Sequence, residues 1–273
     1  MSHQALAQVT VRMRFDPSFA RAVYDNPAVA LRDEALTQEE ISWIHAVDRR
    51  AWGTDPLLRA RTLRTLYEES RGASTLVLAE LRRLSVLYAY FSSPSFHAAM
   101  RARGSLFAAY AAYLRSLHLR TPQLEPVLRL EESLALCRRE LELEPERTRG
   151  AGVVRAPGVG AIAVDGCALS ALNKVEEYLF EVSLLPGMAL AQDAPKLPPL
   201  PPLAPQTPLF LVLQPVLGGS GIRELGPVVQ RALVLLERPM DPQDFVSRTP
   251  GLSADRARAL LRDLEDEGLV QRR

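Results

Sequence analysis

The sequence predicts a mainly α-helical protein, α+β overall, with a helical N-terminal domain and a small α+β C-terminal domain that ends in a winged-helix-like module. Leucine and aromatic residues recur at helical spacing as far as residue 136, which indicates helices that bury one face. The pattern changes near residue 145, where short β-branched runs and prolines begin. The predicted domains are therefore 1–145 and 150–273, and 273 residues are enough for both.

The helices of the first half mark their own starts. Four sites pair a capping side chain with a proline at the first helical position, where the missing N–H would have no intrahelical acceptor: Asp16-Pro17, Asp55-Pro56, Ser93-Pro94 and Thr121-Pro122. Thr37 and Glu40 have the spacing of a capping box. Between these starts, apolar stripes predict one-sided helices around residues 57–67, 76–88, 106–117 and 124–136.

The second half begins with β structure. Residues 153–164, VVRAPGVGAIAV, indicate strand, turn and strand, because β-branched residues flank a Pro-Gly pair. A helix is expected over 169–184 and a buried strand over 209–213. Residues 195–208 hold seven prolines, so they are predicted to form an extended polyproline-II tether. Their Pro-x-x-Pro spacing also occurs in ligands of aromatic grooves.

The tail, residues 222–273, is predicted to be the winged-helix-like module. Helices are expected at about 226–237, 242–248 and 254–266, and Asp241 and Ser253 have the position of N-caps for the last two. Gly268 ends the third helix, and LVQRR follows as a strand. GGSG, residues 218–221, lacks the lysine of a phosphate-binding loop and is expected to be a flexible turn before the module.

No residues have the spacing of a catalytic or metal site. The four histidines include no pair four apart, and there is no Gly-x-Ser-x-Gly motif. Cys137 and Cys167 do not form a Cys-x-x-Cys pair, and Cys137 lies among leucines, which favours a buried thiol. We therefore expect a protein that is not an enzyme and that holds neither metal nor cofactor.

Charge and hydropathy exclude further classes of partner. The net charge of +1 supplies no global field that would draw the chain to nucleic acid or to an anionic membrane. The first residues lack the apolar region of a signal peptide, and no uninterrupted apolar run approaches ~18 residues. Cysteines without disulfide spacing are typical of a reducing compartment. We expect a cytoplasmic protein with no membrane partner.

The last predicted helix is acidic. Residues 253–267 contain three arginines and five carboxylates, a net charge of −2. A helix that reads the major groove of DNA lies among phosphates, which repel such a helix. This charge disfavours nucleic acid as a partner and favours a structural or peptide-binding winged fold.

Four segments of the first half occur in an order that resembles a known family. They are RTLY (64–67), FSSPSF (91–96), RGSLFAAYAAYLRS (103–116) and PQLEPVLRLEESLAL (122–136). Over residues 61–136 the chain is similar to a bacterial family that bears the label of a DNA-binding domain. Its members include partner subunits of multinuclear non-heme iron oxidases that modify ribosomally made peptides, such as the methanobactin partner subunit.

The resemblance implies a non-catalytic partner protein. Such a protein binds a metal-dependent oxidase subunit, which carries the metal ligands, and helps to recruit the precursor peptide. In the family, a C-terminal domain similar to peptide-recognition winged helices serves this recruitment. The alternative function is that of a winged-helix transcriptional regulator that binds DNA.

Two arginines of the last helix are the candidate peptide-binding residues. We expect a peptide to add as a strand to an open sheet edge around residues 209–215 and 268–272. Arg258 and Arg262 are four apart, hence on one helix face, where they would pair with acidic residues of a leader peptide. In the alternative interpretation, they pair with carboxylates of their own helix, Asp255, Glu265 or Asp266.

Overall fold

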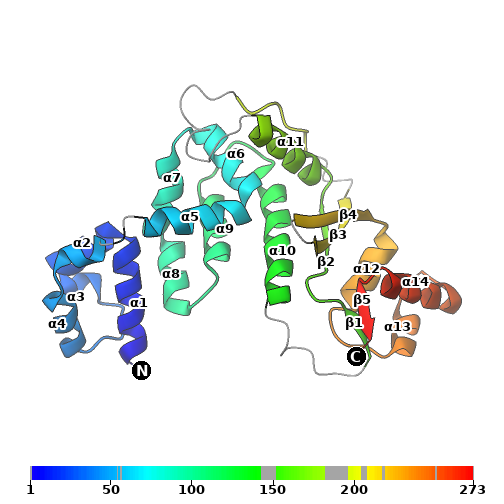
Figure 1. Ribbon diagram of the computed structural model, residues 1–273, viewed down its shortest axis with the longest axis horizontal. Helices are drawn as coiled ribbons and strands as arrows, with labels where there is room; N and C mark the ends of the chain where they lie inside the picture. The colour runs from blue at the N-terminus through cyan, green and yellow to red at the C-terminus, as the bar shows by residue number, and fades with distance from the viewer. Residues whose placement is uncertain are drawn as a thin grey trace. The chain divides into compact units, whose positions relative to one another are not determined.

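The computed structural model of the chain describes residues 2–53, 55, 57–142, 152–181, 196–203, 208–216, 219–249 and 251–272 (Figure 1). The described residues are mainly helical, and all the strands among them lie in the second half. The predicted fold class, mainly α and α+β overall, is therefore confirmed.

The chain divides into two compact units. The N-terminal unit comprises Met1–Leu124 and Val175–Pro198, and the C-terminal unit comprises Glu125–Lys174 and Pro199–Arg273. This division assigns the helix that starts at residue 124 to the C-terminal unit, whereas the sequence pattern placed it with the first domain. Whether domains 1–145 and 150–273 fold independently stays a prediction.

The N-terminal unit is built from short helices. The α-helices are α1 (Ser2–Phe15), α2 (Pro17–Asp25), α3 (Pro27–Ala30), α4 (Gln38–Ala46), α5 (Leu58–Glu69), α6 (Arg71–Leu81), α7 (Leu84–Tyr88), α8 (Pro94–Ala102) and α9 (Leu106–Ser116). Two 3₁₀ turns join them, η1 (Arg49–Gly53) and η2 (Ala89–Ser92). The predicted helix over 76–88 is two helices, because Arg82 has a φ of +52° and ends α6 in the left-handed conformation.

Local capping signals explain most of these helix starts. The Asp16 carboxylate accepts a hydrogen bond from the backbone of Ser18, and Ser93 caps α8 in the same way. Thr37 and Glu40 form both bonds of the predicted capping box. The prediction for Thr121 is wrong: its hydroxyl donates to Glu80 at 2.7 Å, and the following helix begins at residue 124.

The predicted apolar stripes of 57–67, 76–88 and 106–117 contribute to the core of the N-terminal unit, and the stripe of 124–136 contributes to that of the C-terminal unit. In the N-terminal unit, the largest completely buried side chains include the rings of Tyr90, Phe91, Phe96 and Tyr110, whose centroids lie 5.1–5.5 Å from one another in contacting pairs. Such tilted and edge-to-face pairs are favourable for aromatic rings. Two residues of these stripes are exposed instead: Leu57, which precedes the first turn of α5, is 59% exposed, and Leu136 of the 124–136 stripe is 61% exposed.

The C-terminal unit combines two small sheets with helices. Its elements are α10 (Leu124–Glu142), β1 (Val153–Arg155), β2 (Gly160–Asp165), the start of α11 (Cys167–Glu181), β3 (Pro208–Val216), β4 (Gly219–Leu225), α12 (Pro227–Leu235), α13 (Pro242–Arg248), α14 (Ala254–Asp266) and β5 (Val270–Arg272). Of the predicted tether, residues 196–203 form neither helix nor strand, residues 195 and 204–207 lie outside the described residues, and residue 208 is the first of β3.

The larger sheet has the antiparallel order β2-β3-β4, with both faces covered. Leu211 and Leu213 of β3 pack on one face against α10 and α11, whereas Val212 joins the core formed by α12, α13 and α14 on the other. The GGSG prediction is wrong at residues 219–221, which pair with β3 as part of β4. With both faces buried, only the sheet edges remain for a ligand strand.

The winged module takes its central strand from upstream. Strand β1 pairs with β5 on one side (Figure 1). On the other side Val153 exchanges two backbone hydrogen bonds of 2.8 and 2.9 Å with Met240, which lies between α12 and α13. Although β1 and β2 follow each other along the chain, they belong to different sheets. The predicted limits 222–273 therefore leave out a strand that the module contains.

Candidate functional site

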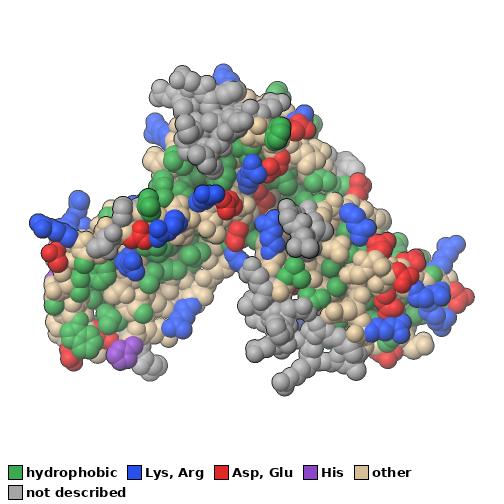
Figure 2. Space-filling model, viewed as in Figure 1, with side chains coloured by type: hydrophobic (Ala, Val, Ile, Leu, Met, Phe, Trp, Pro, Cys, Tyr) green, Lys and Arg blue, Asp and Glu red, His purple; other side chains and the backbone are tan. Residues whose placement is uncertain are grey.

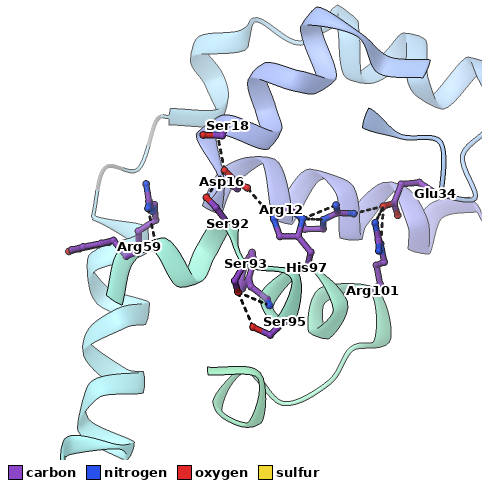
Figure 3. A network of polar contacts seen from close by, with 12 residues as sticks. Arg12, Asp16, Ser18, Glu34, Arg59, Ser92, Ser93, Ser95, His97 and Arg101 are labelled. Carbon is purple, nitrogen blue, oxygen red and sulfur yellow. Dashed lines mark hydrogen bonds and ion pairs between the residues drawn. The ribbon is translucent and has the colours of Figure 1, made fainter. Parts of the chain in front are cut away.

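A buried polar network ties the first helices of the N-terminal unit to α8 (Figure 3). Asp16, which lies between α1 and α2, accepts hydrogen bonds from the Ser92 hydroxyl at 2.9 Å and contacts Nε2 of His97 at 3.0 Å. Arg12 donates from Nε to Nδ1 of His97 at 3.0 Å. Because a guanidinium can only donate, Nδ1 of the ring must accept, so the proton lies on Nε2, facing Asp16.

The same network continues to two further charged groups. Arg12 forms an ion pair with Glu34, and Arg101 donates to the same Glu34 oxygen at 3.0 Å. Arg12 and Asp16 are only 2% and 3% exposed. Buried charges are stable when they are paired and hydrogen-bonded in this manner.

The geometry of the network indicates a structural role. A histidine that acts as a general base keeps one nitrogen for the group that it deprotonates. In this network Arg12 contacts the second nitrogen of His97, and the hydroxyl of Ser92 points to Asp16 instead of to the ring. The network therefore lacks the nucleophile–base contact of a hydrolase, and it fixes α1 against α8.

The ionisation of Asp16 is coupled to the stability of this unit. Burial alone would raise the pKa of Asp16, but hydrogen bonds from His97, from the backbone of Phe19 and from Ser92 outweigh it and hold the pKa below its usual value. A carboxylate with a depressed pKa in the folded state stabilises the fold above its unfolded-state pKa of about 3.9, and this contribution is lost as the pH falls through the folded-state value.

We therefore expect the free energy of unfolding to depend on pH through the ionisation of Asp16. The excess free energy of unfolding of the wild type over Asp16→Asn should shrink as the pH falls below about 4, measured by urea denaturation at several pH values. The matched control is Asp33→Asn, because Asp33 is exposed and its nearest cation, Arg32, lies 3.7 Å away. A wild-type advantage that stays constant down to about pH 2 would contradict the assignment.

The described residues contain neither a group of metal ligands nor a membrane-spanning helix. No group of three His, Cys, Asp or Glu side chains among them is placed to hold a metal ion. Cys137 and Cys167 are free and buried, and burial raises the pKa of the Cys137 thiol to about 11. None of the described helices has the length and apolar character needed to cross a membrane.

Helix α14 presents two charged stripes, one on each side of its buried stripe Ala257, Leu261 and Leu264. One stripe contains Arg258, Arg262 and Glu265, and Glu265 binds Arg272 of β5 at 2.7 and 3.2 Å. The other contains Arg256, Leu260, Asp263 and Glu267, and Glu267 binds Arg223 of β4 at 3.0 Å. Thus one stripe of α14 lies toward β5 and the other lies toward β4.

The structure places the two predicted arginines on the stripe that lies toward β5. Arg258 pairs with Asp255 at 2.9 Å, as the alternative interpretation of this residue expected. Within the described part of the chain, Arg262 makes no ion pair, and the carboxylate of Glu265 binds Arg272 instead. Figure 2 shows positive and negative side chains interspersed over this helix, so its surface has no single sign.

Both edges of the larger sheet leave backbone groups open. The segment predicted as an edge, residues 209–215, belongs to β3, which is paired on both sides; that prediction is wrong. Strands β2 and β4 each pair with β3 alone, and no backbone group of the described residues bonds to the other side of either strand. Strand β4 has seven residues and β2 has six. The sequence did not predict β4, because its first residues, Gly219 to Gly221, are typical of a turn.

Comparisons with family models, with curated proteins and with solved structures found no match to this chain. The resemblance over residues 61–136 therefore remains a hypothesis about function.

Proposed function

We propose that this chain is a non-catalytic partner protein that captures an extended precursor peptide along β4 and delivers it to a metal-dependent, peptide-modifying oxidase. The open edge of β4 is the observation that carries the proposal. A peptide in this position gains main-chain hydrogen bonds from β4, and side chains beside the edge give selectivity.

The surroundings of β4 suit an extended peptide. Arg223 on the strand and Glu267 at the end of α14 are each about half exposed, so a peptide with charged side chains can exchange partners with them. Leu260, which is partly buried on the same stripe, offers an apolar contact between the charges. These features support a site for a peptide of mixed sequence beside β4.

The oxidase part of the proposal rests on the resemblance. Segments 91–96 and 103–116, which carry much of it, form η2, α8 and α9 around the aromatic core of the N-terminal unit. In the family, the oxidase supplies the metal ligands, which agrees with a partner that acts without metal of its own. A gene for such an oxidase next to a short open reading frame would support this part, and the complex would act in the cytoplasm.

The alternative function is transcriptional regulation. Three helices followed by a strand, as in α12, α13, α14 and β5, are also the elements of DNA-binding winged helices. The net charge of −2 over residues 253–267 opposes that function, because phosphates repel an acidic reading helix.

A binding experiment on the full chain tests the β4 assignment. The probe is the short peptide encoded beside the gene, and affinity is measured by fluorescence anisotropy. We expect Arg256→Ala/Asp263→Ala, on the stripe toward β4, to weaken binding about tenfold, because rim contacts of two charged side chains are lost. Hydrogen exchange should slow in residues 219–225 when the peptide is bound.

The control is the double variant Arg258→Ala/Arg262→Ala on the stripe toward β5. If this variant loses the affinity instead, the peptide lies beside β5 and the two arginines predicted from the sequence are its contacts. Unchanged exchange in β4 would also overturn the β4 assignment. Micromolar binding of random duplex DNA that weakens steeply with salt would favour the regulator.

A further inference from the structure

Helices α12 and α13 line an open surface pocket that plays no part in the proposed peptide site. Its volume is about 280 Å³, and its lining residues are Gln230, Arg231, Val234, Leu235 and Arg248. Four of them belong to α12, whereas Arg248 is the last residue of α13. None belongs to β4 or α14, so this is a separate surface of the winged module.

The pocket carries two positive charges without a described counter-charge. Neither Arg231 nor Arg248 forms an ion pair within the described residues, and no acidic side chain lines the pocket. Arg231 donates from Nε to the backbone oxygen of Pro227 at 3.1 Å, which holds its side chain along the helix. The terminal N–H groups of both guanidinium groups can then bind an anion, and a planar oxyanion matches their geometry best.

Besides the arginines, the lining contains one polar residue, Gln230, and two apolar residues, Val234 and Leu235. Val234 is 41% exposed, and Leu235 beside it is partly buried. A free inorganic anion or a nucleic acid backbone would leave these side chains in contact with water. A carboxylate that is attached to an apolar group would satisfy the arginines and would cover Val234 at the same time.

We propose that the α12–α13 pocket is a docking site for a partner protein segment in which a glutamate or aspartate adjoins a leucine-like side chain. The carboxylate binds between Arg231 and Arg248, and the apolar side chain packs on Val234 and Leu235. The two arginines select the carboxylate, and Val234 and Leu235 select the apolar side chain next to it. The inference does not depend on the peptide that β4 is proposed to bind, because the two sites share no residue.

Methyl NMR on the full chain tests the docking site directly. The probe is a blocked leucyl-glutamate dipeptide, titrated into protein with labelled valine and leucine methyl groups up to about 20 mM, since a single short contact binds weakly. The methyl signals of Val234 and Leu235 should shift and saturate. The dissociation constant should rise at least about tenfold in Arg231→Gln/Arg248→Gln.

Three controls make each outcome decisive. Arg21→Gln/Arg49→Gln removes the same charge from exposed positions of the N-terminal unit and should change the dissociation constant by less than about twofold. Blocked leucyl-glutamine and inorganic phosphate should bind at least about tenfold more weakly than the glutamate probe. Equal binding of either control ligand, unchanged binding in the Arg231/Arg248 variant, or the absence of shifts at Val234 and Leu235 would overturn the proposal.

Discussion

Val153→Asp should unfold the winged module at denaturant concentrations that the wild type withstands. Val153 is completely buried in the core of α12, α13 and α14. Its strand, β1, lies between β5 on one side and the backbone of Met240 on the other. A carboxylate at this position has no partner and disrupts pairing on both sides, so we expect a loss of about 4 kcal/mol. Far-UV circular dichroism during urea unfolding measures it.

The two tryptophans make this experiment selective. Trp43 and Trp52 both belong to the N-terminal unit, so tryptophan fluorescence reports on that unit alone, whereas circular dichroism reports on both units. We expect Val153→Asp to shift the circular dichroism transition and to leave the fluorescence transition in place. Leu203→Asp, at an exposed position of the same unit, is the matched control. An unshifted circular dichroism transition in Val153→Asp would contradict the central position of β1.

The second large effect is expected from Asp16→Ala in the N-terminal unit. This change removes the cap of α2 and leaves the protonated nitrogen of His97 and the hydroxyl of Ser92 without their acceptor. Removal of one member of a buried charged network costs about 3 kcal/mol or more. The fluorescence transition of Trp52 and Trp43 should therefore move to lower urea concentration.

Asp33→Ala is the control for this variant, because the Asp33 side chain is 70% exposed and its removal should change the free energy of unfolding by less than about 0.5 kcal/mol. A fluorescence transition that is equal in Asp16→Ala and Asp33→Ala would show that the network contributes nothing measurable. The measured difference between the two variants gives the contribution of the buried site.

The sequence predicted those features that depend on neighbouring residues. The cap at Asp16 and the box of Thr37 and Glu40 are local, because the bonds join residues within three positions of one another. The apolar stripes likewise predicted which faces are buried. Helix ends were less predictable, because Arg82 carries no signal for the left-handed conformation that ends α6.

Features that depend on distant residues could not be predicted. The buried network joins Arg12, Glu34 and His97, which lie far apart in the sequence, and no local pattern marks them as partners. Strand β4 begins with glycines, which favour no regular structure, and it is a strand because β3 pairs with it. The candidate edge therefore appeared only when the pairing partners were known.

The position of β1 has a consequence for biosynthesis. Strand β1 is translated before its partners, Met240 and residues 270–272, which follow 85 or more residues later. Its backbone groups must stay unpaired while the intervening segments are translated, and closing this long loop is slow because entropy opposes it. We infer that the winged module completes its folding after translation of β5, and that the nascent chain exposes an aggregation-prone strand until then.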